Sequence, residues 1–302
     1  CFVRTITNRV SVNITGYLFL FPAILLFATF AWYPIINGLI LSFQHVDLIR
    51  YSNPDRTINW VGLENFRAVF SDPLLGKAWL NTFYFVGLGL IFGYLVPVVF
   101  AVAINEIKFG QSFFRLAFYL PVILPPMISI LLWEYFFDPS NGVLNVLLGL
   151  LGLPALKWIH SQETAMFSLV ILSTWMNAGG TMLLYLAALQ GVSPQMYEAA
   201  EIEGAGIWTR LWHITLPAIR PVMLVLLVLQ IIGTMQVFTE PFVMTDGGPV
   251  NATLTVMLLL YRYAFERGEI GWASALGLML FVFLAIMSGI YFRITKKLRG
   301  EA

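Results

Sequence analysis

Long stretches of this chain contain no Asp, Glu, Lys or Arg, and short polar segments separate them. A helix needs about 20 mostly apolar residues to cross the hydrocarbon core of a bilayer. The pattern therefore predicts an all-α membrane protein made of a single domain, residues 1–302. Its six transmembrane helices are expected at about residues 16–41, 80–104, 113–137, 165–189, 217–239 and 271–293.

Two further apolar stretches, residues 142–156 and 254–265, are shorter and are interrupted by Gly, Pro or Arg. They are expected to lie at the interface or to re-enter the membrane rather than to span it. The first span is interpreted as an anchor instead of a signal peptide, because its apolar stretch is too long and no small-residue cleavage site follows.

The composition agrees with a membrane protein. Hydrophobic residues make up 59% of the chain and charged residues 11%, the formal net charge is +1, and the mean hydropathy is +0.81. Soluble domains are about one quarter charged. The sequence thus excludes an ordinary soluble domain, and its scattered Lys and Arg do not form the basic surface of a nucleic-acid-binding protein.

Residue types that carry catalysis or bind metals are scarce. Cys1 is the single cysteine, and the histidines His45, His160 and His213 are far apart in sequence. No catalytic residue, metal site or cofactor site is therefore predicted. The phosphate-binding pattern GxxxxGK[ST] does not occur, and the spans carry almost no ionisable residues of the kind that proton-driven carriers need. Uphill transport would take its energy from another subunit.

The distribution of basic residues predicts the orientation. Six spans place both termini on one side of the membrane, and that side would hold ten of the 17 Lys and Arg residues. Basic residues are enriched in cytoplasmic segments. Both termini are therefore expected in the cytoplasm, and the basic tail Arg293–Arg299 is the strongest part of this signal.

The polar segment Gly191–Pro221 is the most informative part of the sequence. Ser193 and Pro194 are typical of a helix start, and Gly204 is placed to end the short helix that follows. A second short helix is expected before Leu216 and Pro217, which would close the segment. From these residues alone, an amphipathic loop on the membrane surface remains the alternative.

The same segment resembles the EAA loop of binding-protein-dependent ABC importer permeases. The matching residues are Glu198-Ala199-Ala200, then Glu203-Gly204-Ala205, and finally Ile214-Thr215-Leu216-Pro217. Glu203 stands where the family usually has Asp. The match extends over about twenty positions.

Three other motifs resemble the carbohydrate-uptake branch of that family, in particular its maltose-transporter F-type and glycerol-phosphate A-type subunits. These motifs are Val61–Phe66 before the second span, Asn81-Thr82 at its start, and the turn Asp246-Gly247-Gly248-Pro249 after the fifth span. Asp246 stands where Gly is common.

The resemblance implies a cytoplasmic coupling helix in residues 191–217, between helices 4 and 5, which docks in a cleft of an ATP-hydrolysing subunit. The chain itself would be a transport subunit and no enzyme, with ATP and Mg bound by its partners. It also implies a second homologous permease subunit, two ATP-binding subunits, an extracytoplasmic solute-binding protein and a bacterial plasma (inner) membrane. The coupling residues would be Glu198, Ala199, Ala200, Glu203, Gly204, Leu216 and Pro217.

In the family, spans four and five contribute to the substrate path. Here they offer amide, hydroxyl and aromatic side chains, which suit a sugar or related polyol. The same side chains commonly bond neighbouring helices in membranes, which is the competing interpretation. The path is predicted to include Trp175, Asn177, Gln230, Thr234 and Gln236.

Other functions are compatible with the sequence. Within the family, the solute could be glycerol-3-phosphate, an oligopeptide or another small molecule. Outside it, the chain could be an ATP-independent channel or a secondary carrier. The absence of ionised residues from the middle of spans four and five favours a neutral saccharide over a phosphorylated ligand.

Overall fold

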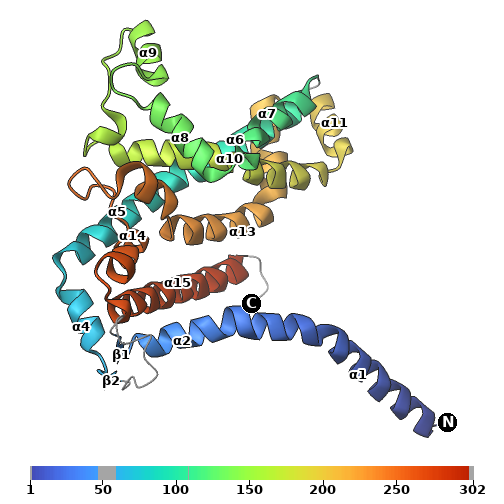
Figure 1. The fold of residues 1–302 in the computed structure, drawn as a ribbon. Helices are drawn as coiled ribbons and strands as arrows, with labels where there is room; N and C mark the ends of the chain where they lie inside the picture. Colours follow the sequence, from blue (N-terminus) through green and yellow to red (C-terminus); the bar gives the residue numbers. More distant parts are fainter. Residues whose placement is uncertain (1, 47–58, 108, 299–302) are drawn as a thin grey trace. The chain divides into compact units, whose positions relative to one another are not determined.

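The computed structural model describes residues 2–46, 59–107 and 109–298, and it is almost entirely helical (Figure 1). The α-helices in this part of the chain are α1 Phe2–Phe27, α2 Tyr33–Leu41, α4 Glu64–Ser71, α5 Pro73–Gly89, α6 Leu95–Glu106, α7 Gln111–Ile123, α8 Pro126–Phe136, α9 Val143–Leu150, α10 Ala165–Gln190, α11 Pro194–Ile202, α12 Ile207–Arg210, α13 Leu216–Met235, α14 Val256–Tyr261 and α15 Ile270–Leu298.

Short irregular elements join these helices. The 3₁₀ turn η3 covers Trp158–His160, and the strands β1, Gln44–His45, and β2, Asn59–Trp60, pair antiparallel with Gln44 opposite Trp60. Wide π-helical turns, which carry one extra residue, interrupt several helices. They are η1 Ala28–Trp32, η2 Leu90–Tyr94, η4 Leu211–Thr215, η5 Pro241–Thr245 and η6 Arg262–Glu266.

Five helices are long and apolar enough to cross a membrane, which confirms the all-α membrane class. They run over Gly16–Leu41, Pro73–Glu106, Ala165–Gln190, Ile207–Met235 and Ile270–Lys296. A sixth crossing is counted if α7 and α8 act as one span.

The predicted span 113–137 is broken, because α7 and α8 meet at an angle of 101°. Leu124 is extended at the break, with ψ at 137°. The residue before a proline is sterically kept out of the helical region, and Pro125 and Pro126 follow Leu124. The apolar window is therefore real, but its prolines divide it into two helices.

The fifth span also differs from its prediction. Leu216 and Pro217 do not close the preceding segment, since Ile207–Met235 forms one helical run. The π-helical turn η4 explains the difference: the Leu216 N–H bonds the Leu211 carbonyl, and the widened turn accommodates Pro217, which has no N–H of its own. The helix ends at Met235, not at residue 239.

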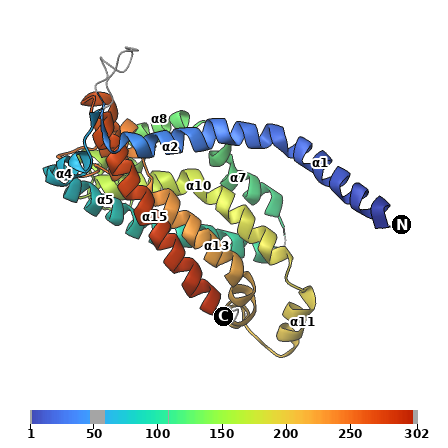
Figure 2. The same cartoon turned by 90° about the horizontal axis from the view of Figure 1, so that it is seen from below.

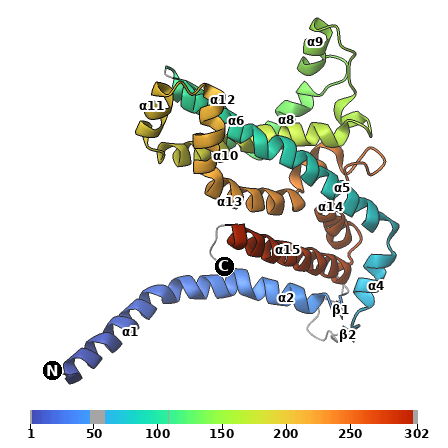
Figure 3. The same cartoon turned by 180° about the vertical axis from the view of Figure 1, so that it is seen from behind.

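The helix α10 forms the centre of the compact unit that comprises residues 73–259 and 282–302. One cluster of buried side chains joins Tyr185 of α10 to α6 and α13, a second joins Leu172 to α8, and a third joins Leu169 to α5. Both α6 and α7 pack directly on α10, and Figure 3 shows α6 beside α10. This helix therefore organises the walls from which a site can be built.

Glycines allow the closest approaches between these helices. A Cβ atom added to Gly179 of α10 would lie 2.1 Å from the Phe118 carbonyl oxygen of α7. A Cβ atom at Gly93 would lie 2.6 Å from the Gln230 amide nitrogen of α13. The Gly89 and Gly93 pair thus faces α13 and is a helix-packing device, as expected for small residues in membrane helices.

The Asn81-Thr82 motif lies in the middle of α5, not at the start of the second span, and it anchors a distant loop. The Asn81 amide donates hydrogen bonds to the carbonyl oxygens of Asn251 (2.8 Å) and Leu254 (3.0 Å). The Thr82 hydroxyl accepts the Val256 N–H at 3.0 Å. These bonds tie the middle of α5 to the loop that follows the turn at Asp246 and to the start of α14.

The other compact unit, residues 1–72 and 260–281, is organised around a buried amide. Asn65, at the start of α4, is 3% exposed and donates to the carbonyl oxygens of Ser42 and Gln44, both at 2.9 Å. Gly271 packs so closely that an added Cβ atom would lie 2.7 Å from the Asn65 amide nitrogen. The motif at residues 61–66 therefore holds this unit together.

Replacing Gly179 by Val should separate α7 from α10, because the new side chain meets backbone that cannot move away. Overpacking of this kind costs about 1–3 kcal/mol or more. The thermal unfolding midpoint of the purified protein in detergent should fall. Gly180→Val is the matched control, since a Cβ atom there meets only a Val122 side-chain carbon at 3.9 Å. Equal midpoints for the two variants would contradict the proposed contact.

Candidate functional site

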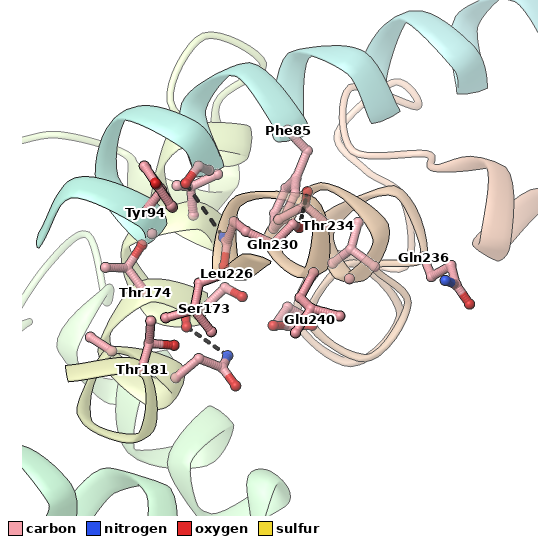
Figure 4. A pocket seen from close by; sticks show the side chains of 18 of the residues that line it. Phe85, Tyr94, Ser173, Thr174, Thr181, Leu226, Gln230, Thr234, Gln236 and Glu240 are labelled. Carbon is pink, nitrogen blue, oxygen red and sulfur yellow. Dashed lines mark hydrogen bonds between the residues drawn. The ribbon is translucent and has the colours of Figure 1, made fainter. Parts of the chain in front are cut away.

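A cavity of about 500 Å³ lies between α10 and α13 and is closed on a third side by α5 and η2 (Figure 4). Its apolar lining includes Phe85, Leu226 and Val237. Its polar lining consists mainly of amides and hydroxyls, namely Tyr94, Ser173, Thr174, Asn177, Thr181, Gln230, Thr234, Gln236, Thr239 and Glu240. Such a wall can bind a ligand through many hydrogen bonds.

The cavity brings together most of the residues predicted for the substrate path. Asn177, Gln230, Thr234 and Gln236 all line it. Trp175 lies apart, in a second cavity of about 420 Å³ whose lining is mostly apolar. There its ring packs edge-on against Trp133, with 5.7 Å between the ring centroids. Trp175 and Asn177 are two residues apart in α10, which places their side chains on different sides of the helix. The two residues therefore line different cavities.

The amide groups of the cavity are oriented by the helices that carry them. The amide nitrogens of Asn177 and Gln236 donate to the carbonyl oxygens four residues earlier, at 2.8 Å and 3.1 Å. The Gln230 amide nitrogen donates across to the Gly89 carbonyl oxygen at 3.4 Å. Within the described residues, no hydrogen bond reaches the three amide oxygens. The cavity therefore presents acceptors.

Sequence reasoning missed four contributors to this wall. Gly89 and Gly93 pack against α13, and their lack of side chains also makes the room that Gln230 occupies. Tyr94 lies at the end of η2 and donates to the Met223 carbonyl oxygen at 2.9 Å. Glu240, which follows α13, lines the cavity and is 8% exposed. The end of α13 at Met235, after which Glu240 is placed on the wall, has no clear local signal in the sequence.

The segment at residues 191–217 forms α11 and α12 at the end of α10, where the chain turns back toward α13 (Figure 2). Gly204 ends α11 in the left-handed conformation, with φ at +80°. Its N–H bonds the Glu201 carbonyl at 3.0 Å, and the Ala205 N–H bonds the Ala200 carbonyl at 2.8 Å. This pair of bonds is the Schellman motif, for which glycine is strongly preferred.

Polar contacts fix this segment to the body of its unit. The guanidinium of Arg210, on α12, bonds the Glu201 carboxylate on α11 and lies 3.7 Å from the Glu106 carboxylate at the end of α6. The hydroxyls of Tyr197 and Thr215 are 3.1 Å apart. The orientation of α11 is thus coupled to both α6 and the start of the run that continues into α13.

The outer face of the segment combines exposed apolar side chains with a carboxylate. Glu198 and Ala199 are exposed and Ala200 is half-buried. Ile202 is 88% exposed, Trp208 75% and Trp212 64%. Exposed apolar side chains of this size beside polar residues are typical of a surface that contacts lipid or another protein. We call the exposed residues Glu198, Ala199, Ile202, Trp208 and Trp212 the outer face of the 191–217 segment.

Taken together, the helices, the polar cavity and the outer face define a multi-pass membrane protein built for solute passage. Residues 86–300 match the family described as binding-protein-dependent transport system inner membrane component. The chain belongs to this family, and it is a transport permease subunit rather than an enzyme.

Curated relatives agree with this family. The chain is 31% identical over 289 residues to the arabinooligosaccharides transport system permease protein AraP of Bacillus subtilis, which covers 94% of this chain and 90% of the relative. It is 32% identical over 283 residues to the sn-glycerol-3-phosphate transport system permease protein UgpA of Salmonella typhimurium, with 92% of each chain covered.

Solved structures show the same architecture. A bacterial alginate ABC transporter in complex with an alginate pentasaccharide-bound periplasmic protein contains a chain that superposes with a TM-score of 0.83. The two chains are 25% identical, and the match covers 96% of this chain and 97% of the other. A second structure, of a bacterial ABC transporter that imports the acidic polysaccharide alginate, gives a TM-score of 0.80 at 26% identity, over 97% of this chain and 100% of the other.

Proposed function

We propose that this chain moves a sugar or related polyol across the bacterial plasma membrane, as one permease subunit of an ATP-driven importer. The cavity between α10 and α13 carries this proposal, because amides and hydroxyls make up most of its polar lining. Hydroxylated ligands pair with such groups. Relatives named for arabinooligosaccharides and for trehalose and maltose support a carbohydrate.

The chief rival substrate is glycerol-3-phosphate, for which one relative is named. A phosphate would gain most from Arg or Lys, whose charge-assisted hydrogen bonds are about twice as strong as neutral ones. No Lys, Arg or His lies among the cavity-lining residues of the described chain. A neutral saccharide therefore fits this wall better than a phosphorylated one.

In the proposed assembly, α11 is the coupling helix and its outer face docks on an ATP-binding subunit. The small side chains of Ala199 and Ala200 permit close packing, and the Glu198 carboxylate suits a basic partner group. Glu203 and Gly204 form the end of the helix that turns the chain back. ATP and Mg would be bound by that partner, and this chain would hold no cofactor.

The assembly also needs a second homologous permease subunit, two ATP-binding subunits and an extracytoplasmic solute-binding protein. One observation favours further protein contacts besides lipid: the membrane-length helix Gly16–Leu41 has none of its window buried within this chain. Such a helix would be covered by lipid and by the second permease subunit.

Alternating access follows from the connection between the docking segment and the cavity. Leu216 and Pro217 lie within the helical run Ile207–Met235, whose far end carries Gln230 and Thr234. Closure of the ATP-binding subunits would therefore move a wall of the cavity along with the docked segment. Such closure would shift the population between outward-facing and inward-facing states.

Replacing Gly204 by Val should uncouple the transporter, because a β-branched residue strains the left-handed turn by about 1–2 kcal/mol or more. We expect the variant to insert in the membrane but to lose ATP-driven uptake in proteoliposomes and much of its co-purification with the ATP-binding subunits. Gly206→Val is the control, since an added Cβ atom meets nothing within 4 Å at either position and only Gly204 has a positive φ. Full activity of Gly204→Val would argue against this coupling helix.

Alanine substitutions of Asn177, Gln230 and Gln236 should each lower uptake while leaving subunit assembly intact. Loss of one hydrogen bond costs about 0.5–1.5 kcal/mol, which is a few-fold change in affinity. Initial uptake rates over a range of solute concentrations are therefore the appropriate measurement. Gln190→Ala is the control, because Gln190 lies exposed at the end of α10 outside the cavity. Wild-type kinetics for all three variants would leave these amides as helix-packing groups.

The orientation with both termini in the cytoplasm can be tested with single cysteines. Ser193→Cys and Ser140→Cys, each combined with replacement of Cys1, place thiols at exposed positions before α11 and after α8. An impermeant maleimide should label position 140 in intact cells, and position 193 only after permeabilisation. The variant without cysteine gives the background. Labelling of position 193 in intact cells would reverse the topology.

A further inference from the structure

Glu240 is a largely buried residue whose carboxylate has no partner among the residues that the structure describes. It follows α13, is 8% exposed and lines the cavity beside Gln236 and Thr239. Figure 4 shows it on the same wall as Gln230 and Thr234. Within the described residues it has no hydrogen bond or ion pair, and its side chain does not cap the π-helical turn Pro241–Thr245 that follows.

The carboxylate oxygens of Glu240 are not among the fully shielded unpaired atoms of the described residues, so they remain open to the cavity. A largely shielded carboxylate that has no protein partner still loses part of its hydration, which is costly. In a membrane protein, ionisable residues at such positions generally face a cavity and serve a ligand. Glu240 contributes nothing visible to the packing of η5. The cost is therefore best explained by a hydrogen-bonding partner that enters the cavity.

The rest of the wall narrows the chemistry of that partner. Each amide nitrogen of Asn177, Gln230 and Gln236 donates one hydrogen bond to a backbone carbonyl oxygen, and the amide oxygens are left as acceptors. Glu240 adds two more acceptor oxygens. The hydroxyl groups of a neutral sugar can donate to these acceptors and accept from the hydroxyls of the wall, whereas an ionised carboxylate or phosphate can only accept and would face the Glu240 charge.

We propose that Glu240 is a substrate-binding residue that accepts hydroxyl hydrogen bonds from an uncharged sugar and excludes anionic sugars. This inference rests on the proposed sugar-import function. It also separates this chain from the two similar solved structures, which are transporters of alginate, an acidic polysaccharide. The Glu240 carboxylate repels uronate groups, and no cation on the described part of the cavity wall offsets that repulsion.

The test measures equilibrium binding to the purified importer with its ATP-binding subunits, in the absence of the solute-binding protein. The probes are maltose, cellobiose and lactose, each offered as the neutral disaccharide, as a uronate with one hydroxymethyl group oxidised, and as an amino sugar. The wild type is compared with Glu240→Gln, which retains the shape of the side chain and removes its charge. Glu134→Gln is the control, because Glu134 is exposed and lies outside the cavity lining.

The wild type should bind at least one neutral disaccharide about tenfold or more tightly than its uronate form, as expected for loss of a charge-assisted contact and gain of repulsion. Glu240→Gln should bind the uronate more tightly and the amino sugar more weakly, and Glu134→Gln should match the wild type. Opposite changes for the two charged probes cannot arise from a general loss of folding.

Two results would overturn the proposal separately from the function on which it rests. One is that the wild-type importer binds a uronate as tightly as its neutral form, and the other is that Glu240→Gln leaves the ratio of the two affinities unchanged. Either result would contradict the proposed role of Glu240 and would leave sugar binding by the cavity supported. The wild-type comparison decides this even if the variant does not assemble. If the wild type binds none of the probes, the sugar cavity and the role of Glu240 fall together.

Discussion

The contact between Gly179 and the backbone of Phe118 sets the spacing on which the central unit depends. A bilayer offers no hydrophobic force between helices, so close van der Waals packing at small residues must hold them together. Gly179 lets α7 approach α10 at backbone distance. With that distance fixed, α10 can present one side to the buried clusters and its polar residues to the cavity.

The polarity of the cavity and the stability of its walls are two aspects of one arrangement. Asn177 and Gln236 satisfy their amide nitrogens on their own helices, and Gln230 satisfies its nitrogen on the Gly89 carbonyl of a neighbouring helix. The same bonds that support the helices orient the free amide oxygens. A single set of side chains thereby reconciles helix packing and ligand binding, which were competing interpretations of the sequence.

Structural features that are determined by nearby residues could be predicted from the sequence. Charge-poor windows identified the helices, and the window at residues 165–189 nearly coincides with α10. The end of α11 at Gly204 was predicted from its glycine, and Asn177, Gln230, Thr234 and Gln236 do share one cavity.

Features that depend on packing between segments far apart in the sequence could not be predicted. The side of α10 on which Trp175 lies depends on how α10 packs against α8, and the position of Glu240 depends on where α13 ends, at Met235. The prolines near residue 125 explain a break in the helix, but the 101° angle between α7 and α8 depends on how each helix packs. The sequence likewise suggested that Pro217 would end a segment, because a π-helical turn that tolerates it has no clear residue signature.

The continuous helical run from Ile207 to Met235 acts mechanically as a lever arm. Its α13 part contains 20 residues, and at about 1.5 Å per residue it is roughly 30 Å long, so a tilt of about 10° displaces one end by roughly 5 Å relative to the other. That displacement is comparable to the width of a sugar ring. In the proposed importer, an arm of this length would convert a small rotation at the ATP-binding subunits into a movement large enough to open or close the cavity.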